Sequence, residues 1–396
     1  MSPPNQSSLS VLVLVFFGSL VFLFNYNFTD AYINSPDKMA LELRSPVDSI
    51  YTWKIADEAP FKYRMLFPLV VKATWAAVRR DPQDNGTFIS VYRGWSYVLF
   101  LTSIITFYGL LRVLGFSPRQ GCAGSLVFTI LPAMSFAFTF PVHTREDLLC
   151  YTLLHLGLIA LLKKRKLLFL LLAVTAVFCR ETLLILPFLY FFYSKERIFT
   201  RALVSTIPVI AWILMRWLAG YEHYDALGLG LRDNLENIFQ TCAFLLMSFN
   251  VLWLPFFFAL ASDKEARSTE LKVIFASALP VSFLILGSTF FLGRVMEIRL
   301  LYLLAPWIIP VVLYAVIQQR DEVTKYVRST RFVLFAVGGF LVLSLVYVAV
   351  WRYRPGLFGM MNGYWWAVLF LSMQLCIISL PCLPRRHGEK ISRRWR

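Results

Sequence analysis

Long apolar runs separated by short polar turns dominate the pattern of residues along the chain. A helix that crosses the hydrocarbon core of a bilayer needs about 20 mostly apolar residues, and ten runs have this character. They cover approximately residues 9–25, 92–111, 122–141, 148–162, 202–219, 237–260, 273–292, 299–318, 332–351 and 364–383. The pattern therefore predicts an all-α, polytopic bundle of membrane-spanning helices.

One further apolar run, residues 167–193, carries Arg180 and Glu181 near its middle. It is either one long helix with two buried charges or two short helices with the charges at the turn. The basic residues distinguish these alternatives, because cytoplasmic loops of membrane proteins carry an excess of Lys and Arg. With two helices, the loops on one side carry 22 Lys and Arg and the short loops opposite carry seven, whereas one helix spoils the alternation. We therefore expect about 12 spans, with both termini in the cytoplasm.

The composition agrees with this interpretation. The chain is 58% hydrophobic and 16% charged, whereas soluble proteins are about 45–50% apolar and about 25% charged. We therefore treat residues 1–396 as one integral domain of the cell (inner or plasma) membrane. The net charge of +16 does not point to nucleic acid, because no basic stretch alternates with aromatic residues as a base-stacking surface requires. The basic tail, 384–396, is expected to contact anionic lipid from the cytoplasm.

The first span, 1–25, is expected to be an uncleaved anchor that is followed by a long external loop over residues 26–91. After Pro68, this loop predicts an amphipathic helix that lies on the membrane surface. Its expected apolar face consists of Leu69, Val70, Ala73, Ala76 and Ala77, with Lys72, Arg79 and Arg80 opposite.

The short outward turns carry most of the remaining ionisable residues. These include Arg145, Glu146, Arg180, Glu181, Arg294, Glu297 and Arg299. A charge at membrane depth costs roughly 3 kcal/mol or more, so such groups usually face a cavity and have a partner. Two interpretations stay open at this point: ion pairs that fix the packing of the helices, or groups that line an outward-facing polar chamber.

Arginines and carboxylates at one membrane boundary suit the transfer of a sugar from a lipid phosphate. Arginines bind phosphate through paired hydrogen bonds and stabilise the charge that grows on it as the glycosidic bond breaks. A carboxylate takes the proton of the attacking hydroxyl group. The chain has no nucleotide-binding fingerprint, so a lipid-linked donor fits better than a nucleotide sugar.

Three short segments and the order of the elements resemble the GT-C superfamily of integral-membrane glycosyltransferases. The segments are Ala59–Pro68, Cys179-Arg180-Glu181-Thr182 and Glu297-Ile298-Arg299, which are similar to stretches of bacterial members. The resemblance implies a polyprenyl-phosphate-linked sugar donor and an acidic general base in the first external loop. Asp30 is the closest positional match for that base, and Asp57 and Glu58 are rivals. The chain lacks a D-x-D motif and a large C-terminal soluble domain, which argues against a peptide acceptor.

The expected function is therefore transfer of a sugar to a glycan, lipid or envelope polymer at the outer face of the membrane. Phosphate contacts are expected from Arg64, Arg180, Arg294 and Arg299, which Glu181 and Glu297 orient, and Arg145 and Glu146 are further substrate-binding candidates. No cofactor is expected, although a divalent cation held by loop carboxylates stays open. The alternatives are a transporter or flippase of a lipid-linked sugar, and another envelope polymerase, ligase or acyltransferase.

Overall fold

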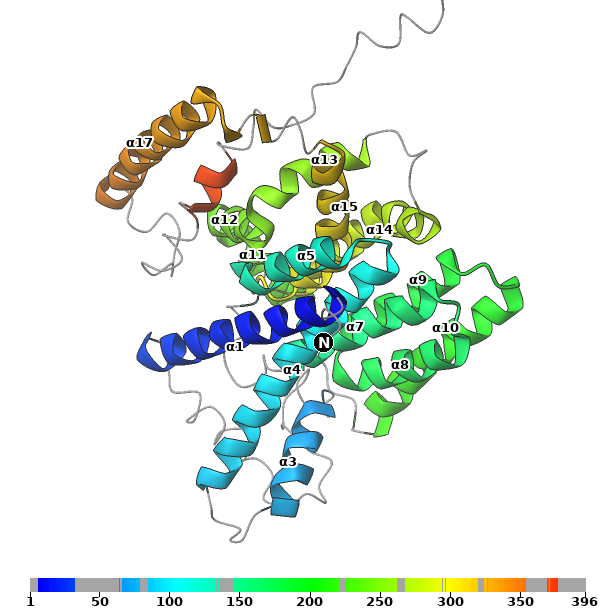
Figure 1. Cartoon of the computed structure of the whole chain (residues 1–396). Coiled ribbons are helices and arrows are strands. Elements are labelled where there is room, and N and C mark those ends of the chain that lie inside the picture. Colours follow the sequence, from blue (N-terminus) through cyan, green and yellow to red (C-terminus); the bar gives the residue numbers. More distant parts are fainter. Residues whose placement is uncertain are drawn as a thin grey trace, which may run out of the picture.

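A computed structural model of the chain contains helices and turns, with no strand among the residues it describes (Figure 1). These residues are 6–32, 64, 66–78, 85–132, 134, 146–218, 220, 226–261, 268–293, 295, 297–319, 324–325, 327–353, 369 and 371–376. The helices are α1 (Gln6–Tyr32), α3 (Leu66–Val78), α4 (Asn85–Val113), α5 (Pro118–Ile130), α7 (Glu146–Leu162), α8 (Lys166–Cys179), η3 (Glu181–Leu184), α9 (Ile185–Tyr193), α10 (Ile198–Leu218), α11 (Ala226–Glu236), α12 (Ile238–Phe249), η4 (Asn250–Leu252), α13 (Trp253–Leu260), α14 (Thr269–Leu292), η5 (Leu301–Leu304), α15 (Ala305–Gln318) and α17 (Thr330–Tyr353).

Six stretches of helix within the described ranges are long and apolar enough to cross a membrane. They are Gln6–Asn25, Gly86–Val113, Ile198–Leu218, Ile238–Leu260, Thr269–Leu292 and Leu301–Gln318. This finding indicates a multi-pass membrane protein. The other expected spans coincide with shorter helices or extend beyond the described residues, so the expected number of twelve is not confirmed.

Helix α7 lies in the centre of the bundle, and 13 of its 17 residues are buried. It packs between α4 and α8 (Figure 1). The thiol sulfur atoms of Cys150 in α7 and Cys179 at the end of α8 are 3.1 Å apart, so the two helices run antiparallel from the short turn at Lys163–Arg165. The first turn of α7 and the last turn of α8 consequently meet at the same end of the bundle.

The apolar run 167–193 is broken at its two charged residues. Arg180 has an extended backbone, with φ −163° and ψ 141°, between α8 and η3. The rings of Phe169 and Tyr190 lie 4.7 Å apart, so the chain doubles back at this break. The two-helix alternative therefore describes the fold correctly. With 14 and nine residues, however, α8 and α9 are each shorter than the roughly 20 residues that a full crossing needs.

Helix α3 is present where the sequence predicts a helix, but Lys72, which was expected on its polar face, is buried. Its buried residues are Phe67, Pro68, Val71, Lys72 and Trp75, whereas Ala73 and Ala77 are exposed. The buried rings contact α4, because Phe67 packs on Tyr92 and Trp75 packs on Phe88. The aromatic side chains bury more apolar area than the alanines, and this determines which face packs against the bundle.

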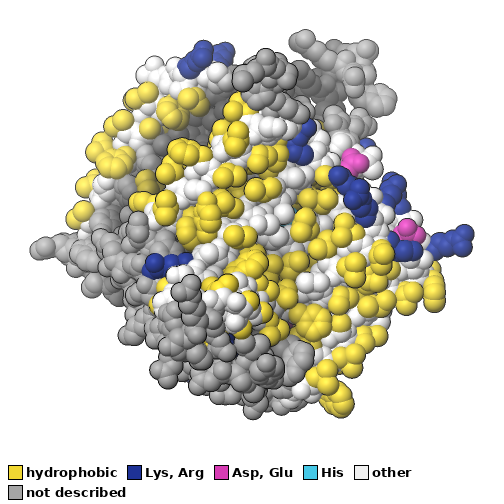
Figure 2. All heavy atoms as spheres, turned by 60° about the horizontal axis from the view of Figure 1, so that its bottom comes forward, with side chains coloured by type: hydrophobic (Ala, Val, Ile, Leu, Met, Phe, Trp, Pro, Cys, Tyr) yellow, Lys and Arg dark blue, Asp and Glu magenta, His cyan; other side chains and the backbone are white. Residues whose placement is uncertain are grey.

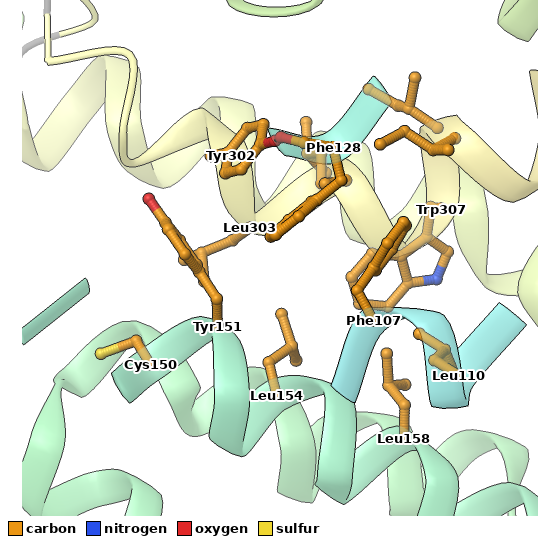
Figure 3. Close-up of a cluster of buried hydrophobic side chains, with 14 of the residues drawn as sticks. Phe107, Leu110, Phe128, Cys150, Tyr151, Leu154, Leu158, Tyr302, Leu303 and Trp307 are labelled. Atoms are coloured by element: carbon orange, nitrogen blue, oxygen red, sulfur yellow. The ribbon is translucent and has the colours of Figure 1, made fainter. Parts of the chain in front are cut away.

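A column of aromatic rings fills the part of the core that lies beyond the first turn of α7, beside the middle of that helix. Phe107 of α4, Phe128 of α5, Tyr302 of η5 and Phe249 of α12 stack with centroid distances of 4.6, 4.9 and 5.8 Å. The Tyr302 hydroxyl donates to the Phe128 carbonyl oxygen. Figure 3 shows Phe107, Phe128 and Tyr302 side by side, with Tyr151 of α7 pointing toward Tyr302. The neighbouring helices α4 and α5 are therefore joined to α12 and η5, which are distant from them in sequence, in one tightly packed column.

Hydrophobic side chains also cover much of the described outer surface (Figure 2). The exposed examples include Phe16 and Phe24 of α1, Phe199 and Trp217 of α10, Phe283 of α14 and Leu345 of α17. Water-soluble monomers rarely expose apolar patches of this extent. Contact with lipid acyl chains accounts for such a surface.

Candidate functional site

Charged side chains from four separate stretches meet where α7 begins and α8 ends. Arg64 lies between two glutamates: its Nη1 is 2.8 Å from Glu146 Oε1, and its Nη2 is 2.6 Å from Glu181 Oε1. Its Nε–H also donates to Glu181 Oε2 at 3.3 Å. Arg64 thus forms the two-pronged contact with Glu181 that a planar guanidinium group favours.

Asp147 joins the other two arginines. Its Oδ1 accepts a hydrogen bond from Arg180 Nη1, and its Oδ2 lies 2.7 Å from Arg299 Nη1. Arg299 Nη2 is also 2.5 Å from Glu297 Oε2. Since Asp147 follows Glu146 and Arg180 precedes Glu181, both sets of ion pairs form one charge cluster, which consists of Arg64, Glu146, Asp147, Arg180, Glu181, Glu297 and Arg299.

Local structure explains why these side chains converge. Glu146 and Asp147 occupy the first turn of α7, where the partial positive charge of a helix N-terminus stabilises carboxylates. The extended backbone of Arg180 ends α8 and places its side chain beside that turn. The hydroxyl group of Tyr151, one turn further along α7, donates to the Arg299 carbonyl oxygen at 2.9 Å.

Asn234 of α11 holds the segment that supplies Glu297 and Arg299. Its side-chain nitrogen donates to the carbonyl oxygens of Phe290 and Gly293, both at 2.8 Å, at the end of α14. Its side-chain oxygen accepts from the backbone N–H of Val295 at 2.9 Å. The last carbonyls of a helix have no partner within the helix. Asn234 satisfies two of these groups and fixes the path of the chain toward the charge cluster.

The charge cluster is buried on one side and accessible on the other. The side chains of Arg64, Arg180, Asp147 and Arg299 are at most 6% exposed, whereas those of Glu181 and Glu297 are 27% and 24% exposed. Solvent therefore reaches the cluster past these two glutamates. Among the described residues, the buried Nε–H groups of Arg180 and Arg299 have no acceptor. Both donors are unpaired, and an added group reaches them only when a neighbouring side chain moves.

The ionisation states follow from the neighbouring charges. Although burial opposes the charged form, the carboxylates of Glu181 and Glu146 raise the pKa of Arg64 above its ordinary value. Burial, with the guanidinium groups of Arg64 and Arg299 nearby, lowers the pKa of Arg180 to about 9, which still leaves it a cation at neutral pH. Burial also opposes ionisation of Glu297, but Arg299 holds its pKa below the usual value.

The structure brings together six of the candidate residues that the sequence indicates. These are Arg64, Glu146, Arg180, Glu181, Glu297 and Arg299. The expectation that Glu181 and Glu297 contact arginines agrees with the geometry. Asp57, Glu58, Arg145 and Arg294 lie outside the described residues, and only the backbone of Asp30, near the end of α1, is described. The position of the general base relative to the charge cluster therefore stays a prediction.

Two residues of this region were not predicted from sequence. Asp147 was not among the candidates, although it contacts two arginines. It shares a helix face with the buried Tyr151, Leu154 and Leu158, so its spacing from them could have indicated an inward side chain. Asn234 gave no such signal, because asparagine is common in any polar turn.

A metal centre finds no support in the described part of the chain, where no three His, Cys, Asp or Glu side chains group as ligands. His155 packs in the core instead. Its ring lies 5.1 Å from that of Phe107, and its Nδ1 is 3.2 Å from Thr106 Oγ1.

Comparisons with known proteins leave this geometry as the main guide to function. No protein-family model, no curated protein and no solved structure matches the chain.

Proposed function

We propose that this chain is an integral-membrane glycosyltransferase of the cell membrane, with both termini in the cytoplasm. It would transfer a sugar from a polyprenyl-phosphate-linked donor to a glycan, lipid or envelope polymer at the outer face. One observation carries the proposal: three arginines from separate stretches converge at one end of the bundle, and two of them keep a buried Nε–H without an acceptor among the described residues.

The Nε–H groups of Arg180 and Arg299 mark the position that we propose for the phosphate. Arg180 and Arg299 both contact Asp147, so their guanidinium groups lie close together and both could donate to one phosphate. Preorganised donors stabilise the charge that develops on the phosphate oxygens as the bond to the anomeric carbon breaks. The acceptor hydroxyl group attacks that carbon and gives its proton to a carboxylate, for which Asp30, Asp57 and Glu58 are the candidates.

The charge balance of the cluster limits how a phosphate can bind to it. Three guanidinium groups face four carboxylates, so the empty cluster has a formal charge of −1 and does not attract an anion by its net charge. The phosphate must therefore displace a carboxylate. Glu181 and Glu297 are the two that solvent reaches, so they can turn outward and release Arg64 and Arg299 to the donor.

The position of the charges favours a transferase over a transporter. Transporters bind their substrates near the middle of the bilayer. Here the buried ion pairs gather where α7 begins and α8 ends, and the described middle of α7 is apolar around His155.

The proposal is tested with the conservative variant Arg180→Lys. Lysine keeps the positive charge but lacks the planar, forked donor group. We expect normal accumulation in the membrane but about 100-fold slower transfer from radiolabelled undecaprenyl-phosphate glucose or mannose in proteoliposomes. Binding of undecaprenyl phosphate should weaken in parallel.

The matched control is Arg232→Lys, in an exposed ion pair with Glu236 that lies outside the charge cluster, and it should leave both measurements unchanged. Asp30→Asn, Asp57→Asn and Glu58→Gln then identify the base, because only its loss should slow transfer without weakening the binding of undecaprenyl phosphate. Wild-type binding and turnover in Arg180→Lys would contradict the proposed phosphate site.

A further inference from the structure

A second polar site lies at the other end of α7, outside the charge cluster. A cavity of about 530 Å³ is lined there by Gly109, Arg112 and Val113 of α4, Leu162 and Lys163 at the end of α7, and Glu270 of α14. With 17 residues, α7 is about 25 Å long. The cavity and the charge cluster are thus separated by nearly the thickness of a hydrocarbon core.

Hydrogen bonds hold the walls of this cavity together. The Arg112 guanidinium group donates to the carbonyl oxygen of Phe116, just beyond α4. Ser268 caps α14 by accepting from the backbone N–H of Leu271 at 3.2 Å, and its hydroxyl group donates to the Leu114 carbonyl oxygen at 3.3 Å. The first turn of α14, which carries Glu270, is therefore fixed against the end of α4.

The charged groups of the cavity are not neutralised within the described structure. Arg112 and Lys163 are exposed and Glu270 is half-buried, and none of them forms an ion pair with another described residue. Two cations suit a phosphate. The carboxylate of Glu270 would repel that phosphate unless the ligand also carried a hydrogen-bond donor or a positive charge close by.

We propose that this cavity binds the head group of a phospholipid with a primary amine, as in phosphatidylethanolamine. Its phosphate lies between Arg112 and Lys163, and its ammonium group donates to Glu270. Val113 and Leu162 provide apolar contact for the glycerol and the start of the acyl chains. Basic pockets between helices at the cytoplasmic surface are known to bind lipid head groups, and Lys164, Arg165 and Lys166 follow directly in sequence. This inference does not depend on the proposed transferase activity.

The test measures which lipids stay bound to the purified full-length protein. The protein is delipidated, exposed to equal amounts of phosphatidylethanolamine and phosphatidylcholine of the same chain length, and examined by native mass spectrometry. Choline has no N–H group for Glu270, so we expect about tenfold preference for phosphatidylethanolamine, the effect of one charge-assisted hydrogen bond. Glu270→Gln should reduce this preference while binding persists.

Arg112→Gln with Lys163→Gln should lower the binding of both lipids. The control pair Lys325→Gln with Arg328→Gln changes two exposed basic residues outside the cavity and should have no effect. Equal retention of the two lipids by the wild-type protein would overturn the proposal, as would unchanged binding in the Arg112/Lys163 variant. Displacement of the lipid by millimolar inorganic phosphate would assign the cavity to free phosphate instead.

Discussion

At the scale of the residue, the sequence shows which charged side chains are unusual but not which of them form ion pairs with each other. Arg180 and Glu181 stand out in the sequence, because two ionisable groups interrupt an apolar run and buried charges need partners. The partners of Arg180 and Glu181 cannot be identified from the sequence, since Arg180 pairs with Asp147, and Glu181 pairs with Arg64, 117 positions away. Only the folded bundle brings Asp147 between two arginines, and nothing in its own turn indicates that it contacts both.

The same contacts lead to a prediction about stability. Asp147→Asn removes the charge that Arg180 and Arg299 share, so two buried cations lose their main partner. Breaking a buried ion pair typically costs about 3–5 kcal/mol. We therefore expect a clearly lower thermal unfolding midpoint in detergent micelles.

The comparison variant is Glu236→Gln, which breaks the ion pair of Arg232 and Glu236, whose side chains are 74% and 56% exposed. Such a pair contributes about 0–1 kcal/mol, so the midpoint should barely change. Equal effects of Asp147→Asn and Glu236→Gln would show that the charge cluster contributes no more to stability than a surface pair.

At the scale of the element, positions of helices were predictable and their contacts were not. Apolar runs locate α4, α10 and α14 well, because periodicity and length are properties of a segment alone. The face by which α3 packs on the bundle was not predicted, since nearly every residue of Leu66–Val78 is apolar and α4 determines which side is buried. The close approach of α11 to α14 likewise gave no signal before the fold was known.

This close approach leads to a second prediction. A Cβ atom at Gly230 of α11 would lie 2.8 Å from the backbone nitrogen of Gly293, and backbone atoms cannot move aside as a side chain can. We expect Gly230→Ala to separate α11 from α14 and to cost about 1–3 kcal/mol. It should also slow sugar transfer, because Asn234 then loses its hold on the segment that carries Glu297 and Arg299.

Gly287→Ala provides the control, because a Cβ atom at Gly287 of α14 meets nothing within 4 Å. Alanine favours a helix over glycine by about 1 kcal/mol, so this variant should unfold at a slightly higher temperature. A Gly230→Ala protein as stable and active as the wild type would show that the contact between α11 and α14 is looser than described.

At the scale of the whole molecule, α7 separates two chemically different ends. The charge cluster lies at its first turn, and the basic turn Lys163–Lys166 lies beyond its last turn. The sequence predicts this polarity through the distribution of Lys and Arg among the loops. The expected number of twelve spans is not confirmed, because an apolar run does not show how many of its residues form one continuous helix, and α8 and α9 have only 14 and nine residues.

The orientation of the protein in the membrane can be measured by labelling intact cells with a membrane-impermeant maleimide. In a background with the six native cysteines replaced by serine, Glu236→Cys should be labelled from outside, because α11 lies against the end of α14 near Arg299. Lys164→Cys should be labelled only after permeabilisation. Labelling of both positions from the same side would contradict the proposed orientation.

The stacked rings of Phe107, Phe128, Tyr302 and Phe249 have a consequence for permeation. A solute passing from the arginines to the opposite leaflet along this route would have to separate four side chains that α4, α5, η5 and α12 clamp together. The stacked rings therefore close this route through the described core. Under the proposed transferase activity, the donor and acceptor therefore reach the charge cluster from its own side of these rings, and the products leave by that side.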